Sequence, residues 1–171
     1  GEIHKVIDNI ARLGETAQQA LKEMRLLVYE LRPLALETAG LADALQHRLD
    51  AVEKRAGVNT KLRVELDAEL SADVENTLYR IAQETLNNSL KHAEATIISV
   101  SLWSREQEVQ MEIVDNGKGF DAEHMQDGAG LGLVSIRERI EALGGTSWIT
   151  SRPAEGTRIS VNIPLKPRGE R

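Results

Sequence analysis

Residues 78–120 read LYRIAQETLNNSLKHAEATIISVSLWSREQEVQMEIVDNGKGF, and they set the expected architecture. They begin inside a helix that Ser71 is expected to cap and that runs to about His92. Two runs rich in β-branched residues, 96–103 and 109–114, are separated by a polar turn, which predicts paired strands. A polar, glycine-rich loop then extends from Asp115 to about Gly130.

The flanking segments extend this pattern in both directions. Residues 41–56 predict a helix and residues 61–66 a strand, whereas residues 131–143 predict a helix that ends at Gly144. Residues 146–151 and 157–164 predict a final hairpin. A helix followed by an α/β body that ends in consecutive strands predicts a two-layer α/β sandwich with a mixed sheet. The strand order stays open at this point.

A long helix is expected over residues 3–31, before Pro33. Its apolar residues recur in steps of three and four, which is typical of a coiled coil or helical bundle; they are Ile3, Val6, Ile10, Leu13, Ala17, Ala20, Met24, Leu27 and Leu31. We therefore expect weak self-association of this chain through that helix. The chain starts at Gly1 already inside the pattern, so we expect it to be a fragment of a longer protein.

The composition narrows the possible functions. With 41% hydrophobic residues, the 171-residue chain can bury a core. A net charge of −6 argues against nonspecific nucleic-acid binding, and the absence of cysteine excludes disulfides and thiolate metal sites. No apolar run approaches the ~18–20 residues of a membrane span, and no signal peptide is visible, so we expect a cytoplasmic segment without membrane contact.

Three short motifs follow one another along the chain. Glu84 and Asn88 lie four residues apart on one helix face, where they can hold a metal ion and a water together. Asp115 lies in the turn DNGKG, and glycines at positions 128, 130 and 132 open a helix, where backbone N–H groups can face phosphate oxygens. Alone, each motif has an ordinary structural explanation as a turn, a solvated helix face or a packing loop. Together, in this order, they predict a nucleotide pocket.

These motifs resemble the N, G1 and G2 boxes of the ATP-binding domain shared by sensor histidine kinases, gyrase, Hsp90 and MutL. The segments VYELRPLALETAGLADAL, QETLNNSLKHA and GLGLVSIRERIEALGG resemble histidine kinases of the NarX, LiaS and DesK type. The resemblance implies a Bergerat-type ATP-binding fold preceded by one long helix. It also implies that residues 1–32 are the second helix of a dimerisation domain and residues 33–171 the catalytic domain.

The resemblance further implies a role for each matching residue. Glu84 would polarise the attacking nucleophile, Asn88 would hold Mg²⁺, and Asp115 would bind the adenine amine of ATP. Oxygen ligands are those that Mg²⁺ prefers. The other implied contacts to the nucleotide are from Lys91 to phosphate, from Gly117 and Gly119 near the base, from Thr157 to the water beside Asp115, and from Gly128, Gly130, Leu131, Gly132 and Leu133 in the lid and the phosphate-facing helix start.

One departure concerns the phosphoacceptor, which in this type of kinase is a histidine followed by an acidic residue. His4 is followed by Lys5, and no such pair occurs in the chain. The implied function is thus the catalytic domain of a homodimeric kinase that phosphorylates a histidine outside this chain, for relay to a response regulator receiver domain. The alternatives are an anti-sigma-factor serine kinase and a nucleotide-binding interaction module without phosphotransfer. Trp103 and Trp148 are expected to be packing residues.

Overall fold

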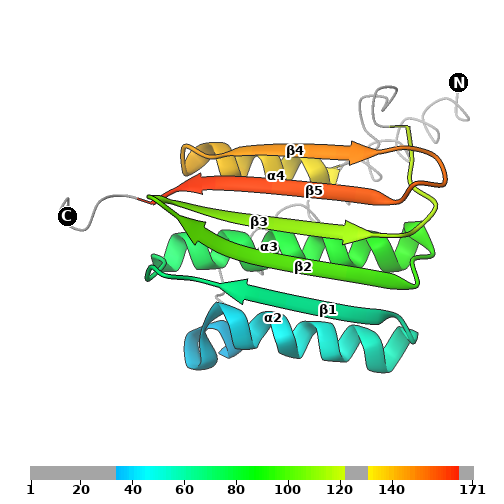
Figure 1. Cartoon of the computed structure of the whole chain (residues 1–171), viewed down its shortest axis with the longest axis horizontal. Coiled ribbons are helices and arrows are strands. Elements are labelled where there is room, and N and C mark those ends of the chain that lie inside the picture. The colour runs from blue at the N-terminus through cyan, green and yellow to red at the C-terminus, as the bar shows by residue number, and fades with distance from the viewer. Residues whose placement is uncertain (1–33, 122–130, 166–171) are drawn as a thin grey trace, which may run out of the picture.

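The computed structural model describes residues 34–121 and 131–165 (Figure 1). The expected helix over residues 3–31 lies outside these ranges, as do Gly128, Gly130 and the side chains of Leu131 and Leu133. No helix in the described ranges is both long and apolar enough to cross a membrane.

A five-stranded mixed sheet forms one layer of the molecule, in the order β1-β2-β3-β5-β4. β1 pairs parallel with β2, and the other neighbours are antiparallel. The strands are β1 (Asn59–Glu65), β2 (Ile97–Arg105), β3 (Glu108–Asp115), β4 (Thr146–Ser151) and β5 (Thr157–Pro164). The mixed sheet and the paired strands agree with the sequence-based expectation.

The helices form the second layer; they are α2 (Leu34–Ala56), α3 (Ala72–Asn88) with the π-helical turn η1 (Ser89–Ala93), and α4 (Leu131–Ala142). In Figure 1, α3 and α4 lie behind the strands, and α2 lies along the β1 edge of the sheet. Alternate residues of β3, namely Val109, Met111 and Ile113, are buried in the core. Asp115 follows in the same alternation, so the last buried position of β3 carries a carboxylate rather than an apolar side chain.

Three local features bear on the sequence-based expectations. Ser71 caps α3 as predicted, with its hydroxyl accepting a hydrogen bond from Val74 N at 3.4 Å. The helix expected over residues 41–56 follows a kink at Gly40, whose φ is 78°, and a shorter helical segment from Leu34 precedes that kink within α2. The packing role expected for Trp148 is wrong, because this residue is 58% exposed on an edge strand.

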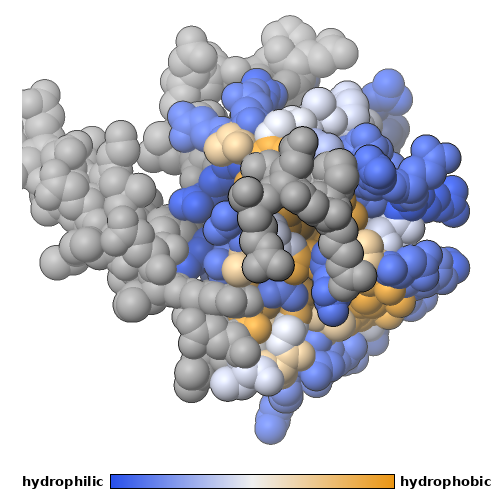
Figure 2. Space-filling model, turned by 90° about the vertical axis from the view of Figure 1, so that its left-hand side faces the viewer, coloured by the Kyte–Doolittle hydropathy of each residue, from blue (hydrophilic) through white to orange (hydrophobic). Residues whose placement is uncertain are grey.

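The two ends of the sheet differ in chemistry. At the left-hand end in Figure 1, partly buried leucines follow β1, α4 and β5; they are Leu66, Leu143 and Leu165. Figure 2 faces this end and shows apolar residues reaching the surface among hydrophilic ones. At the right-hand end, β3 and β4 finish and β2 and β5 begin, and the polar residues of the predicted site lie there.

Candidate functional site

Asp115 occupies the end of β3 and is only 5% exposed. Its Oδ2 accepts a hydrogen bond from Ser89 Oγ at 2.8 Å, and its Oδ1 accepts one from Gly117 N at 2.9 Å. Both oxygens are thereby fixed in place. A carboxylate oxygen has a second lone pair, so each can still accept a hydrogen bond from a ligand amine.

The turn after Asp115 packs so closely against its neighbours that side chains would not fit. A methyl group on Gly117 would overlap the carbonyl oxygen of Ala93, and Lys118 N donates to that same oxygen at 2.8 Å. Gly119 has φ +58°, and a methyl group there would overlap the carbonyl oxygen of Arg152. The glycines of DNGKG therefore let the turn fit between η1 and the β4–β5 connection.

Thr157 lies directly beside Asp115 in the β3–β5 pairing. Its hydroxyl is 3.1 Å from Ser151 Oγ, which donates to the carbonyl oxygen of Gly156 at 2.8 Å and accepts from Phe120 N at 3.0 Å. The strand register thus places Thr157 opposite Asp115, while its predicted role at the nucleotide stays a prediction. The structure adds Ser151, which the sequence analysis did not identify and which ties the glycine turn to the hairpin.

Ser89 was also missed, because the helix was expected to continue regularly to about His92. The backbone instead widens into a π-helical turn at Ser89, and the serine hydroxyl reaches Asp115 from there. Single π-turns occur often at functional sites. The only signal in the sequence was a polar residue directly after Asn88. The structure shows that this position is buried, with 2% of the residue exposed.

The last turns of α3 carry the predicted catalytic and metal-binding groups. Glu84 and Asn88 are both partly exposed, and Lys91 is exposed. Gly132 of α4 lies against Glu84, since a methyl group on Gly132 would overlap Glu84 Oε1. The first and last motifs therefore meet in space, and the start of α4 lies beside the helix that carries Asn88.

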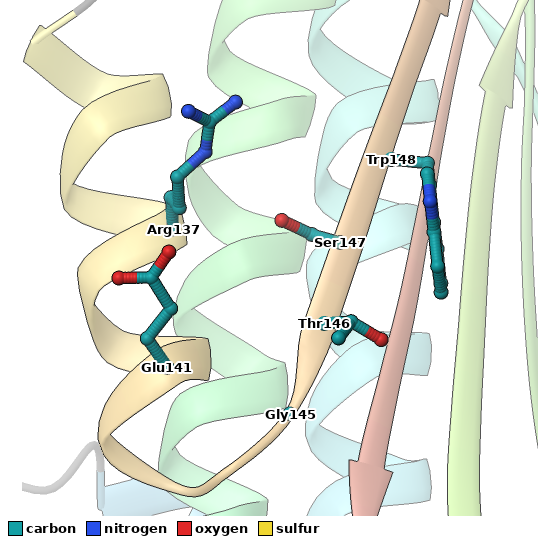
Figure 3. A pocket seen from close by; sticks show the side chains of 6 residues that line it. All are labelled: Arg137, Glu141, Gly145, Thr146, Ser147 and Trp148. Carbon is teal, nitrogen blue, oxygen red and sulfur yellow. The ribbon is translucent and has the colours of Figure 1, made fainter.

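A pocket of about 340 Å³ lies near the opposite end of the sheet, between the last turns of α4 and the start of β4. Figure 3 shows Arg137 and Glu141 on α4, with Ser147 and Trp148 on opposite sides of β4. It contains none of the residues predicted to bind a nucleotide.

Comparison with known proteins identifies the family to which this chain is similar. The family described as histidine kinase-, DNA gyrase B-, and HSP90-like ATPase matches residues 73–167, a range that includes Glu84, Asp115 and Thr157. Curated relatives include the sensor histidine kinase LiaS of Bacillus subtilis, 33% identical over 95% of this chain and 45% of that protein. The oxygen sensor histidine kinase NreB of Staphylococcus carnosus is 33% identical over 94% of this chain and 47% of that protein.

Solved structures show the same fold. The histidine kinase domain of the blue-light activated histidine kinase EL346 from Erythrobacter litoralis matches with a TM-score of 0.57 and 20% identity, over 73% of this chain and 61% of that one. The mycobacterial sensor histidine kinase MprB matches with a TM-score of 0.53 and 18% identity, over 72% of this chain and 95% of that one. The present chain spans less than half the length of LiaS and NreB.

Proposed function

Because the chain belongs to the family of histidine kinase-, DNA gyrase B-, and HSP90-like ATPases, we propose that it binds Mg-ATP as the catalytic part of a sensor histidine kinase. The observation that carries this proposal is the fixed carboxylate of Asp115, held by Ser89 and Gly117 at the sheet end where the glycine turn begins. The similarity to LiaS and NreB, both sensor histidine kinases, supports the same assignment.

Adenine recognition would rest on Asp115 and Thr157. The base amine would donate to a free lone pair of the carboxylate, while the Thr157 hydroxyl holds a water between Asp115 and the base. The tight fit of Gly117 and Gly119 against η1 and the hairpin keeps side chains away from that place. The burial of Asp115 keeps competing water away from the hydrogen bond.

Phosphate binding would use Asn88, Lys91 and the start of α4. In the described part of the chain, no hydrogen bond or ion pair occupies the side chains of Asn88 and Lys91, so both can turn to a ligand. Mg²⁺ held by Asn88 and phosphate oxygens would neutralise charge on the triphosphate. Lys91 would add a positive charge, and the N–H groups that open α4 would face phosphate oxygens.

The acceptor would be a histidine of the dimerisation domain outside this chain. Its imidazole nitrogen would form a bond to the γ-phosphorus as the bond from that phosphorus to the oxygen of the leaving ADP breaks. Glu84 would accept the proton from the other ring nitrogen, which makes the attacking nitrogen a better nucleophile. The phosphoryl group would then pass to an aspartate of a response regulator receiver domain.

The remaining assignments complete this proposal. Residues 1–32 would be the second helix of the dimerisation domain, residues 33–171 the catalytic domain, and the parent protein a homodimer with this segment in the cytoplasm. An interaction module that binds ATP without transferring phosphate is the second candidate, and it stays open because the chain itself holds no His-acidic pair.

Two measurements test the proposal. Asp115→Ala should lose a hydrogen bond of ~1.5–3 kcal/mol to the base, which is roughly a ten- to hundredfold loss of ADP affinity by calorimetric titration. Asp43→Ala, an exposed control on α2, should bind ADP normally. A folded Asp115→Ala variant with unchanged affinity would remove the adenine assignment.

The second measurement follows label from γ-labelled ATP. The chain alone should acquire no acid-labile phosphate, whereas a separately supplied two-helix segment with a His-acidic pair should become labelled. ADP binding without any transfer would favour the interaction module. Label on the chain that disappears in His4→Ala would make His4 the acceptor.

A further inference from the structure

Gly132, the second residue of α4, lies directly against the side chain of Glu84 on α3. A methyl group on Gly132 would overlap Glu84 Oε1, and it would lie 2.8 Å from Cδ and 3.2 Å from Cγ of the same residue. Non-bonded carbon atoms normally stay ~3.5–4.0 Å apart. The Glu84 carboxylate therefore occupies the space that the Cβ of any other residue at position 132 would need.

The backbone gives no reason for glycine at this position. Among the described residues, the positive-φ glycines are Gly40, Gly57, Gly119, Gly144 and Gly156, and Gly132 is not one of them. Alanine stabilises a helix more than glycine does, and the three atoms nearest to a methyl group here all belong to Glu84. The contact with Glu84 is thus the feature that distinguishes glycine from alanine at position 132.

We propose that Gly132 is a positioning residue: because glycine has no Cβ, the Glu84 carboxylate can lie against the backbone at the start of α4. The proposal rests on the function above, in which Glu84 accepts a proton from the attacking imidazole beside phosphates that face α4. A glutamate side chain has several rotatable bonds and loses conformational freedom when it is held in one place. The contact with Gly132 keeps the Glu84 carboxylate at the start of α4 before the acceptor histidine arrives. This matters because a misplacement of about 1 Å can slow a reaction roughly a hundredfold.

The variant Gly132→Ala tests the contact between Gly132 and the Glu84 carboxylate directly. It should fold, because alanine suits the helix and the displaced atoms are at the end of a flexible side chain. We expect phosphoryl transfer to the supplied two-helix segment to slow by about ten- to a hundredfold, and by clearly more than any loss of ADP affinity in the same variant. Glu138→Ala, at an exposed position of the same helix, is the control and should change neither quantity.

A double variant separates this role from a general effect on α4. If Gly132 acts through Glu84, then Gly132→Ala should slow the Glu84→Ala variant no further. An equal slowing in both backgrounds would overturn the proposal. A loss of ADP affinity in Gly132→Ala as large as the loss of rate would also overturn it, in favour of a direct phosphate contact.

A readout without transfer keeps this inference separate from the proposed function. The side-chain carboxyl ¹³C resonance of Glu84, assigned by its loss in Glu84→Ala, should shift in Gly132→Ala and stay in place in Glu138→Ala. An unshifted resonance would overturn the contact even if transfer is observed. If the parent chain transfers no phosphate but the resonance still shifts in Gly132→Ala, the proposed function is contradicted. The contact between Gly132 and Glu84 is then still supported.

Discussion

At the scale of single residues, Asp115 depends on donors that come from different parts of the chain. Gly117 is two residues away on the same turn, whereas Ser89 comes from η1 and is 26 positions away in sequence. A buried carboxylate oxygen without its donor loses more than one hydrogen bond's net contribution, because it remains desolvated. The orientation of Asp115 toward a base is thus a property of β3 and η1 together.

The variant Ser89→Ala isolates the longer-range donor. It removes the hydroxyl from Asp115 Oδ2 while Gly117 N still holds Oδ1. The loss of this donor costs about 1–3 kcal/mol, part of it in folding stability rather than in binding, so we expect a twofold to roughly tenfold loss of ADP affinity by calorimetry. Ser101→Ala, on a partly exposed position of β2, is the control. Equal ADP affinity in both variants would show that Gly117 alone orients the carboxylate.

The sequence predicted the residues whose spacing carries information and missed those whose role depends on the fold. Asp115 and Gly119 were identifiable because DNGKG precedes a glycine-rich helix start. Ser89 and Ser151 were not, because serine is common and their hydroxyls meet their partners only after strands β3, β4 and β5 assemble. The positions of Gly128 and Gly130 in the site stay predictions.

At the scale of elements, α3 and η1 form a single structure with a change of pitch at its functional end. Apolar periodicity correctly located α3, whose buried residues include Leu78, Ile81 and Leu86. The widening at Ser89 could not be predicted from it, because one extra residue in a turn barely alters a periodic pattern over a helix of this length. The turn ends at Glu94 with φ 54°, which sends the chain into β2.

Two polar residues of α3, Glu84 and Asn88, should have separate roles in phosphoryl transfer and in Mg²⁺ binding. Asn88→Ala should weaken the Mg²⁺ dependence of ADP binding, because it removes an oxygen ligand. Glu84→Ala should leave ADP binding nearly unchanged and slow transfer to the supplied two-helix segment by ~10²-fold or more. Calorimetry with and without Mg²⁺ measures the first effect, and a labelled-ATP time course measures the second. Equal losses of ADP affinity in the two variants would show that the roles are wrongly divided.

At the scale of the whole molecule, the predicted site lies at the end of the sheet where β3 and β4 finish and β2 and β5 begin. The hairpins β2–β3 and β4–β5 follow from sequence, since their strands are close along the chain. The insertion of β5 between β3 and β4, and the parallel pairing of β1 with β2 through α3, were left open by the sequence. These pairings join distant segments, and they bring Thr157 opposite Asp115.

Assembly is the property of the whole chain that the sequence predicts outside the described residues. The apolar stripe between Ile3 and Leu31 would follow a helix of roughly 40 Å at ~1.5 Å per residue, and it would be a large exposed patch on a monomer. The expected partner is the same stripe on a second copy, as in a helical bundle. Ala17 and Ala20 bury little area and Gly14 weakens the helix, so we expect the dimer to be weak.

Sedimentation equilibrium over a range of concentrations measures this association. The parent chain should shift from monomer toward dimer as concentration rises, whereas Ile10→Glu combined with Leu27→Glu should remain monomeric, because charges buried in an apolar seam are costly. ADP affinity should be the same in both, since these substitutions lie outside the predicted catalytic domain. A double variant that associates as well as the parent chain would place the contact on another surface, and the exposed edge strand β4 with Trp148 would then be the first region to substitute.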